Sequence, residues 1–355
     1  MGRASFCEKM AEIDYDIDLD AVEDVVRSRG ARRIVLQLPE GMLQYSLVIA
    51  KCLEERLDGV EVFIHADQTF GACDLHFGEL DITLKPDIIV HVGHSPYPPE
   101  LAHKNLEPQG SRILYVGAYS KLGVNRKQVL EAARLLREEY DVSRIGITTT
   151  AQHVHKVGEI EEILKAGGFK VAVHSGRSPY FRHAQVIGCD YSLARAVKAD
   201  GYIFFGGGVF HPLGLYLATL KPVVKVDPYS GSVEDLTSSG EKIYRSRLFA
   251  VSKAIGARRW GIIVGIKTGQ YRPWLVRKLV NAIAEAGGEY ALIASEVTTL
   301  QQLVALDNQW YDAFTITSCP RLPTDDFWSY EKPVLTPGEA LMAIEGRLEP
   351  YRFPW

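Results

Sequence analysis

The sequence predicts an α/β protein of three pseudo-symmetric repeats, each a mostly parallel four-stranded sheet flanked by helices. Two observations lead to this prediction. Short apolar, β-branched runs alternate with helix-like segments along the chain, which is typical of parallel α/β units. Four such landmarks then recur in the same order three times, which indicates an internal repeat. We therefore expect repeats at residues 1–120, 121–230 and 231–355 that enclose one central site.

The first strand of each repeat is expected where an arginine opens an apolar run. These runs cover residues 33–37, 144–148 and 259–264. Each run ends in a polar loop rich in glycine or threonine and continues into a helix-like segment. The loops are Leu38-Pro-Glu-Gly41, Thr149-Thr-Ala-Gln152 and Lys267-Thr-Gly-Gln270.

Three further strands are expected in each repeat. The second strands are predicted at 60–65, 169–174 and 288–293, the third at 86–91, 199–204 and 311–316, and the fourth at 112–116, 222–226 and 333–336. Right-handed crossovers place the carboxyl ends of parallel strands at one edge of a sheet, where ligands bind. We expect these three edges to face inward. Chance similarity among α/β segments is the alternative, and the shared order of four landmarks argues against it.

The composition is that of an ordinary globular protein. The 355 residues suffice for two or three domains, with 46% hydrophobic and 24% charged residues. The formal net charge of −4 gives no global nucleic-acid signature. No apolar run reaches the roughly 18 residues of a membrane span, and the start lacks a signal-peptide apolar region. The five cysteines do not resemble a secreted disulfide framework. We expect a cytoplasmic protein with no membrane or direct nucleic-acid partner.

Three cysteines fall one in each repeat, in loops beyond strand ends. Cys73, Cys189 and Cys319 are separated by 116 and 130 residues, so they form no local metal-binding motif. Three thiolates around one point suit a [4Fe–4S] cluster with one open iron. Cys73 and Cys189 follow second strands, whereas Cys319 follows a third strand, so the expected site is only pseudo-symmetric.

Other interpretations of the cysteines remain open. Zinc also accepts three protein ligands plus water, although an all-thiolate set favours iron–sulfur, and the spacing does not decide. Free cysteine is also a common buried small hydrophobe. We adopt that last interpretation for Cys7, in an expected N-terminal extension, and for Cys52, within a helix-like run.

Eight strings, in order, resemble the 2-(3-amino-3-carboxypropyl)histidine synthase family, which acts in the first step of diphthamide biosynthesis. They are Gln37-Leu-Pro-Glu-Gly41, Gly71-Ala-Cys73, His91-Val-Gly-His94, Gln185-Val-Ile-Gly-Cys189, Gly206-Gly-Gly-Val-Phe-His-Pro-Leu-Gly214, Lys267-Thr-Gly-Gln270, Ser318-Cys-Pro-Arg321 and Lys332-Pro-Val-Leu-Thr-Pro337. Each string alone is weak, but the ordered set is specific and spans residues 15–340. The compact length is similar to the archaeal single-chain form.

The resemblance implies a homodimer in which Cys73, Cys189 and Cys319 hold a [4Fe–4S] cluster. It further implies that the cluster, reduced by an external electron donor, cleaves the bond between sulfur and the γ-carbon of S-adenosylmethionine. The resulting 3-amino-3-carboxypropyl radical adds to carbon 2 of a histidine of translation elongation factor 2, and methylthioadenosine is released. No side chain is assigned as catalytic. The segment after Cys73 is less acidic than the family suggests, which leaves the roles of Asp74 and His76 open.

Several loop residues are candidates for binding S-adenosylmethionine. Gly207 and Gly208 could bring backbone amides close to a carboxylate, and His211 could donate to that carboxylate or to a ribose hydroxyl. Lys267 and Gln270 could present a cation and an amide to the same cavity. For each of these residues a plain turn or a structural hydrogen bond is the alternative.

Gln37 and Glu40 occupy the equivalent loop of the first repeat and are further candidates. Arg321 follows the third cysteine by two residues and could raise the cluster potential or bind the cofactor carboxylate, with a surface ion pair as the alternative. His94 could line the cluster pocket or make a structural hydrogen bond. The aromatic tail at 351–355 is expected to pack on the body or on a partner subunit.

Two other functions are consistent with three repeats carrying one cysteine each. One is a Lewis-acid [4Fe–4S] enzyme of the quinolinate-synthase type, which acts on a small hydroxy acid. The other is a non-catalytic triplicated binding protein, which predicts a colourless product even after anaerobic purification. The eight strings favour the histidine-modifying transferase.

Overall fold

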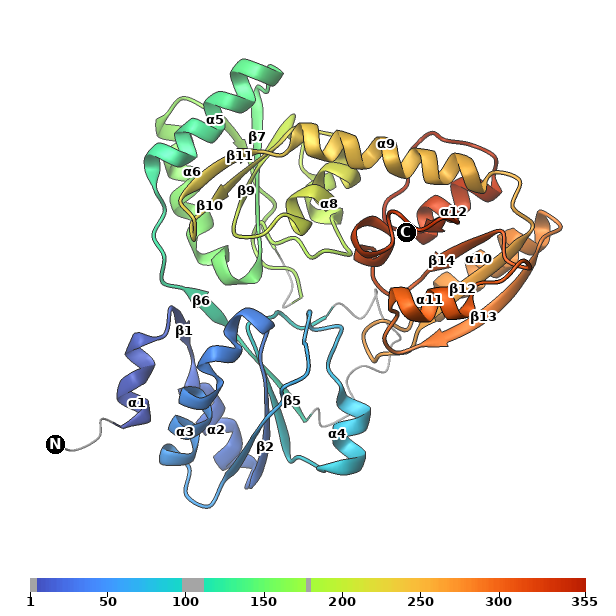
Figure 1. The fold of residues 1–355 in the computed structure, drawn as a ribbon. Coiled ribbons are helices and arrows are strands. Elements are labelled where there is room, and N and C mark those ends of the chain that lie inside the picture. Colours follow the sequence, from blue (N-terminus) through green and yellow to red (C-terminus); the bar gives the residue numbers. More distant parts are fainter. Residues whose placement is uncertain (1–4, 98–111, 177–179) are drawn as a thin grey trace.

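Three α/β units surround a common centre (Figure 1). The computed structural model describes residues 5–97, 112–176 and 180–355. The first unit contains strands β2 (Arg33–Gln37), β3 (Glu61–Ile64), β4 (Ile88–Val92) and β5 (Ile113–Val116). They form a wholly parallel sheet in the order β3-β2-β4-β5.

The middle and third units repeat this arrangement. The middle strands are β7 (Arg144–Thr149), β8 (Lys170–Ala172), β9 (Gly201–Phe205), β10 (Val223–Asp227) and β11 (Ser232–Asp235), in the order β8-β7-β9-β10-β11. The third-unit strands are β12 (Arg259–Gly265), β13 (Glu289–Ser295), β14 (Ala313–Ile316) and β15 (Val334–Leu335), in the order β13-β12-β14-β15. In every unit the second strand lies at one edge of the sheet and pairs with the first strand, which is followed by the third and then the fourth. This order confirms the predicted α/β fold.

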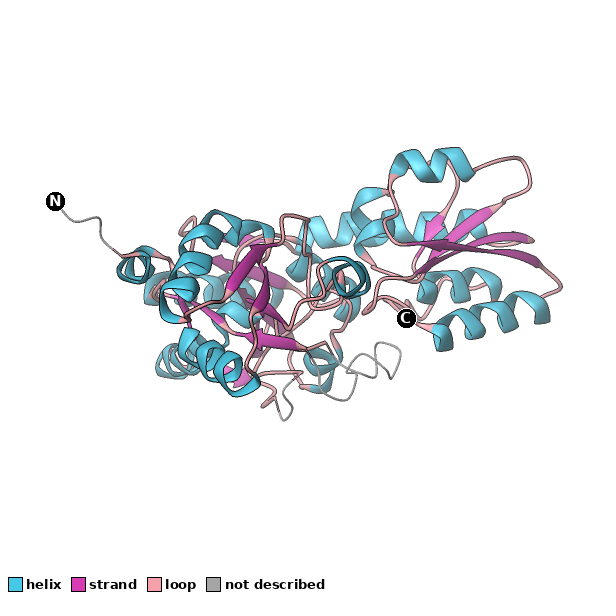
Figure 2. Cartoon of the chain, turned by 90° about the horizontal axis from the view of Figure 1, so that it is seen from below, coloured by secondary structure: helices cyan, strands magenta, loops and turns pink. Residues whose placement is uncertain are grey.

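Helices cover the faces of these sheets (Figure 2). The longer ones are α2 (Leu19–Arg29), α3 (Ser46–Arg56), α5 (Arg126–Tyr140), α6 (Val157–Ala166), α8 (Phe210–Thr219), α9 (Thr237–Ala254), α10 (Pro273–Glu285) and α12 (Pro337–Ile344). Shorter helices are α1 (Phe6–Lys9), α4 (Phe77–Thr83), α7 (Ser192–Ala196) and α11 (Leu300–Leu306). Because helices pack on both faces, strands such as β4 and β9 are buried along their whole length. Helix α9 contacts both α8 and α12 and so joins the middle unit to the third.

Two features were not predicted. Strand β11 adds an antiparallel fifth strand to the middle sheet, because Asp227-Pro-Tyr-Ser-Gly231 turns the chain straight back. Gly231 has a φ of 72° and donates its N–H to the Asp227 carbonyl at 2.9 Å, a conformation that glycine adopts easily. A short antiparallel pair, β1 (Tyr15–Ile17) with β6 (Ala118–Ser120), also stands apart from the main sheets.

One carboxylate contact recurs in all three units. The aspartate that precedes each third strand accepts a hydrogen bond from the backbone N–H of the arginine that opens the first strand. The pairs are Asp87 with Arg33 at 2.8 Å, Asp200 with Arg144 at 2.8 Å, and Asp312 with Arg259 at 2.9 Å. Backbone N–H groups lower the pKa of both carboxyls, those of Arg32 and Arg33 at Asp87 and that of Arg144 at Asp200. The recurrence supports the internal repeat independently of strand order.

A close glycine contact recurs in the middle and third units. Gly146 on β7 lies beside Tyr202, and Gly261 on β12 lies beside Phe314. A Cβ atom added at either glycine would fall 2.4 Å from the aromatic ring. The shared Arg-x-Gly-Ile pattern of these strands thus leaves room for an aromatic residue on the adjacent third strand.

Cys7 and Cys52 form a disulfide between α1 and α3. The prediction that both are ordinary unpaired residues is therefore wrong, although Cys52 is fully buried as expected. The two cysteines are 45 residues apart in the sequence and meet because α1 packs across α3.

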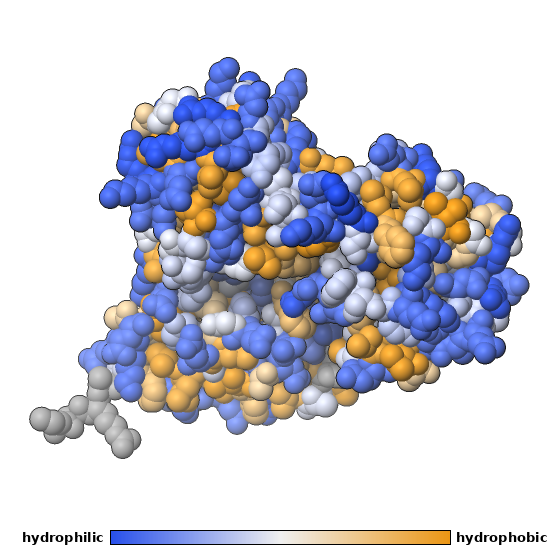
Figure 3. All heavy atoms as spheres, turned by 45° about the horizontal axis from the view of Figure 1, so that its top comes forward, coloured by the Kyte–Doolittle hydropathy of each residue, from blue (hydrophilic) through white to orange (hydrophobic). Residues whose placement is uncertain are grey.

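On the face in Figure 3, hydrophilic residues surround scattered apolar patches. Within the described part of the chain, no helix combines the length and the apolar character that crossing a membrane requires.

Candidate active site

A cavity of about 880 Å³ lies where the three units meet, within the range of ordinary ligand sites. Thr150, Gly208 and Lys267 line it, and they follow β7, β9 and β12. The carboxyl ends of strands from different sheets therefore open toward one space, as expected for parallel α/β units.

Cys73, Cys189 and Cys319 all line this cavity, and none forms a disulfide. Burial and the neighbouring thiols Cys189 and Cys319 raise the pKa of Cys73 to about 12. Burial likewise raises the pKa of Cys189, and that of Cys319 to about 11. Three crowded thiols in a low-dielectric cavity resist ionisation unless a cationic centre binds them. This all-thiolate set fits an iron–sulfur cluster or a soft metal ion.

Contacts from the third unit hold the Cys73 loop. The N–H of Gly269 donates to the Cys73 carbonyl at 3.2 Å, and Gln270 Nε2 lies 3.9 Å from Cys73 Sγ. A Cβ atom at Gly269 would fall 2.3 Å from the Cys73 Cα, so only glycine permits this approach. Because these residues belong to different units, the contact also fixes the first unit against the third.

Arg272 and Tyr97 also line the cavity beside the cysteines, although neither was among the site residues predicted from the sequence. The Tyr97 hydroxyl is 3.2 Å from Cys189 Sγ and accepts from Arg272 Nη2. Arg272 is 1% exposed, and the Trp355 ring lies 4.7 Å from its guanidinium carbon. The aromatic tail thus packs on the body of the protein, which was one of its two expected positions. Arg272 follows the predicted loop 267–270 by two residues, but its sequence position alone does not show that it is buried.

Lys267 does not present a free cation. Its Nζ lies 2.5 Å from Asp74 Oδ1, and Asp74 is fully buried. His76 Nε2 lies 3.3 Å from the same oxygen and 3.2 Å from the Gln68 carbonyl. Asp74 and His76 therefore form a structural network with Lys267. His76 also groups with His65 and Asp67, but because its Nε2 already has these partners we assign no second metal site there.

Two neutral histidines line the cavity. Burial lowers the pKa of His94 and of His211 to about 4. His94 Nδ1 lies 3.0 Å from His91 Nε2, and His91 Nδ1 lies 3.1 Å from Gln37 Oε1. Gln37 is fully buried behind this chain and is not among the residues that line the cavity; it supports His91 and through it His94.

The remaining candidates divide by position. Glu40, Gly208, Gln270 and Arg321 line the cavity. Gly207 does not, because it faces the Tyr229 ring, 3.0 Å from where a Cβ atom would lie. The Arg321 side chain is 44% exposed and pairs with Asp325 at 3.2 Å.

Comparison with known proteins identifies the family. A sequence model described as "Putative diphthamide synthesis protein" matches residues 38–352. The chain belongs to this diphthamide synthesis family. The family's curated relatives include the 2-(3-amino-3-carboxypropyl)histidine synthase of Pyrococcus horikoshii, 34% identical over 342 residues, which cover 96% of this chain and 93% of that protein. Subunit 1 of the human synthase is 27% identical over 338 residues, covering 93% of this chain and 72% of that protein.

Solved structures in the diphthamide synthesis family share this fold. The crystal structure of Dph2 from Pyrococcus horikoshii with a 4Fe-4S cluster has a TM-score of 0.76 and 32% identity, covering 96% of this chain and 92% of that chain. A second Dph2 structure from that organism has a TM-score of 0.78 and 33% identity, covering 96% and 93%. These findings confirm the predicted family and fold, and the relatives' names confirm that the chain is an enzyme of the transferase class.

Proposed function

We propose that this enzyme transfers the 3-amino-3-carboxypropyl group of S-adenosylmethionine to carbon 2 of a histidine of translation elongation factor 2. Cys73, Cys189 and Cys319 hold the [4Fe–4S] cluster that this reaction needs. The observation that carries the proposal is that three cysteines without disulfide partners, one from each unit, line a single cavity. The 4Fe-4S cluster in the Pyrococcus horikoshii Dph2 structure supports the ligand assignment.

A bound cluster with an open iron would supply the electron for reductive cleavage of the carbon–sulfur bond. Overall, that bond breaks and a carbon–carbon bond to the imidazole forms. Methylthioadenosine leaves, and the ring regains its aromatic form as carbon 2 loses a proton and the adduct gives back one electron. The net reaction consumes no electron, so an external donor is needed only to bring the cluster into its reduced state.

The protein's own groups orient the co-substrate. The exposed guanidinium of Arg321 and the backbone at Gly208 suit the carboxylate of the methionine moiety. Gly208 has a φ of 72° and open space where a side chain would stand. Glu40 suits the ammonium group or a ribose hydroxyl, while His211 and Gln270 offer neutral hydrogen-bonding groups. Lys267 supports the Cys73 loop through Asp74 instead of binding substrate.

The protein acts in the cytoplasm as a homodimer of the archaeal single-chain type. Its near-complete coverage of the Pyrococcus horikoshii protein supports that type. The outer edge of β13 suits a subunit contact, because Tyr290 and Leu292 are 41% and 55% exposed on this edge strand. An electron donor and elongation factor 2 complete the set of partners.

The decisive experiment incubates the dithionite-reduced, anaerobically purified protein with carboxyl-labelled S-adenosylmethionine and archaeal elongation factor 2. We expect label in one histidine of the factor and stoichiometric methylthioadenosine. Factor with that histidine replaced is the matched control and should stay unlabelled. A brown, reducible protein that transfers no label under rigorous exclusion of oxygen would point to a different substrate.

The ligand assignment has its own test. Single replacement of Cys73, Cys189 or Cys319 by Ala should abolish or strongly reduce the brown colour and the electron paramagnetic resonance signal of the reduced cluster. The paired variant Cys7→Ala/Cys52→Ala is the matched control, because it removes two cysteines outside the cavity. An intact cluster after loss of any one of the first three would refute the assignment.

A further inference from the structure

Two arginines of the third unit are almost completely buried, with 2% exposure for Arg247 and 1% for Arg272. Arg247 has its own counter-charge, since its Nη2 lies 2.6 Å from Glu339 Oε2 and its Nε donates to Oε1 at 3.0 Å. Arg272 differs: among the described residues, no carboxylate forms an ion pair with it. A buried guanidinium without a counter-charge is strongly unfavourable.

Neutral oxygens surround Arg272. Nη1 donates to the carbonyls of Gln270 at 3.0 Å, Thr317 at 2.9 Å and Ser318 at 2.6 Å, while Nη2 donates to the Tyr97 hydroxyl. These bonds fix the orientation of the guanidinium but do not cancel its charge. The fold therefore holds a positive charge in place at the wall of the cavity.

The anionic partner that remains is the cysteine set. Cys73, Cys189 and Cys319 line the same cavity as Arg272. Tyr97 links the guanidinium directly to one thiol, since its hydroxyl also lies 3.2 Å from Cys189 Sγ. An oxidised [4Fe–4S] core with three thiolates carries one net negative charge, and reduction adds a second.

We propose that Arg272 is a positioning residue that supplies the counter-charge to the cysteine-held cluster and raises its reduction potential, with Tyr97 relaying a hydrogen bond to Cys189. The inference rests on the proposed function, because it needs the cluster. Raising the potential was one of the alternatives for Arg321, but the Arg321 side chain is 44% exposed and pairs with Asp325, so solvent screens its charge.

Trp355 strengthens the effect of Arg272. Its ring lies 4.7 Å from the guanidinium carbon and helps keep the group out of water. Because a charge acts more strongly where water is excluded, the tail contributes to the potential without touching a cysteine. Trp355→Ala should therefore lower the potential in the same direction as loss of the charge, but by less.

The test is a dithionite titration of the holoenzyme followed by electron paramagnetic resonance. Arg272→Gln should lower the equilibrium constant for one-electron reduction at least tenfold, which corresponds to about 59 mV. Arg272→Lys, which keeps the charge, should retain most of the wild-type potential. Arg321→Gln is the matched control, and its shift should be less than half as large. Equal potentials for wild type and Arg272→Gln at equal cluster content would overturn the inference.

Other outcomes separate this inference from the proposed function. A wild-type protein that takes up no cluster overturns both. If Arg272→Gln fails to fold or to load, an unchanged potential in Trp355→Ala overturns the counter-charge. Tyr97→Phe tests the relay, because it keeps the guanidinium and removes the hydroxyl that joins Arg272 Nη2 to Cys189 Sγ. A lowered potential in that variant supports the relay, and an unchanged potential refutes it.

Discussion

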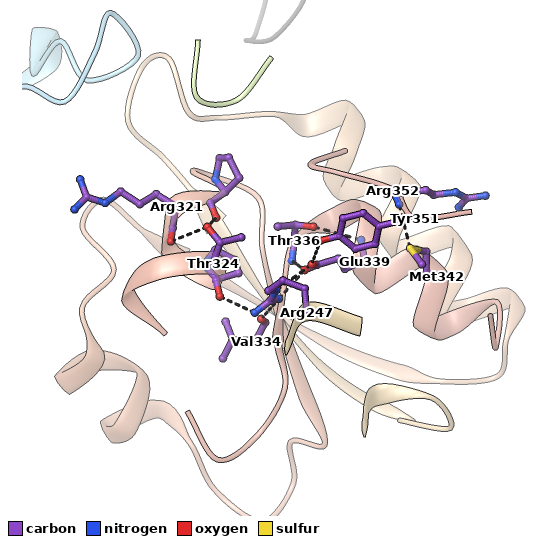
Figure 4. A network of polar contacts seen from close by, with 11 residues as sticks. Arg247, Arg321, Thr324, Val334, Thr336, Glu339, Met342, Tyr351 and Arg352 are labelled. Atoms are coloured by element: carbon purple, nitrogen blue, oxygen red, sulfur yellow. Dashed lines mark hydrogen bonds and ion pairs between the residues drawn. The ribbon is translucent and has the colours of Figure 1, made fainter. Parts of the chain in front are cut away.

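Replacing Glu339 by Gln should destabilise the third unit more than any other single hydrogen-bond substitution there. The carboxylate is fully buried and accepts four hydrogen bonds (Figure 4). Two come from Arg247 Nε and Nη2, at 3.0 and 2.6 Å, one from the Tyr351 hydroxyl at 2.7 Å, and one from the Thr336 backbone N–H at 2.8 Å. Glutamine preserves the shape but turns an amide donor toward groups that all donate.

The expected cost follows from what remains after the substitution. Arg247 would stay buried with neutral partners, namely the Gln oxygen and the Pro323 and Val334 carbonyls at 2.6 and 2.7 Å, and without a counter-charge. Removing one partner of a buried ion pair costs about 3–5 kcal/mol. Tyr351→Phe keeps the ion pair and loses one hydrogen bond to a charged acceptor, which costs about 1.5–3 kcal/mol. The difference in the free energy of unfolding between these two variants isolates the cost of the unpaired Arg247 charge.

Tryptophan fluorescence provides a selective assay. All five tryptophans of the chain lie at residue 260 or later, so their emission reports the third unit. In urea titrations, the unfolding midpoints of both variants should lie well below that of the wild type. The midpoint of Glu339→Gln should be the lower of the two.

The double variant Arg247→Met/Glu339→Met completes the comparison. It removes both charges and should recover part of the loss, because apolar replacements of a buried pair are often tolerated. An equal or smaller loss in Glu339→Gln than in Tyr351→Phe would refute the claim that the Glu339 charge is needed to balance Arg247.

Three further predictions concern other contacts. Reducing the Cys7–Cys52 disulfide, which closes a loop across 45 positions, should lower the free energy of unfolding by about 4 kcal/mol, measured by urea titration with and without reductant; an unchanged midpoint would contradict it. Gly269→Ala should push the Cys73 loop away and lower bound iron and sulfide per chain, and full cluster content would show that the loop can shift freely. The Arg259 side chain holds the pKa of Asp312 at about 2, below its ordinary 3.8. The ionised Asp312 therefore stabilises the fold above pH 3.8, and this contribution to the free energy of unfolding is lost as the pH falls toward 2. In fluorescence-monitored urea titrations, Asp312→Asn should make the free energy of unfolding fall less steeply over this pH range.

Much of the fold was predictable because its signals are local and repeated. Each first strand opens with an arginine, and each third strand follows an aspartate, so the sequence already contained the pairs that the structure joins, such as Asp87 with Arg33. Strand β11 was not predicted, because the segment 227–231 is compatible both with a hairpin turn and with a loop that leads to the next unit. The disulfide was missed because it depends on how α1 crosses α3, a contact without local spacing.

The candidate site was predictable in its cysteines but less so in the residues around them. Lys267 and Gly207 fall in the expected loops, yet one is neutralised by Asp74 and the other faces Tyr229. Loop position follows from the strand pattern, whereas side-chain direction depends on partners from other units. Arg272 shows the same limit, because in sequence nothing distinguishes an unpaired buried arginine from a surface one.

The distribution of the three cysteines also bears on how the protein matures. Cys73 lies in the first quarter of the chain and Cys319 near its end, and each belongs to a different unit. Under the proposed function, a cluster gains its full ligand set only after residue 319 has been synthesised, because the third thiol comes from the last of the three units. Cluster insertion therefore depends on contacts between all three units, and a partly synthesised chain with only Cys73 and Cys189 lacks one of the three protein ligands.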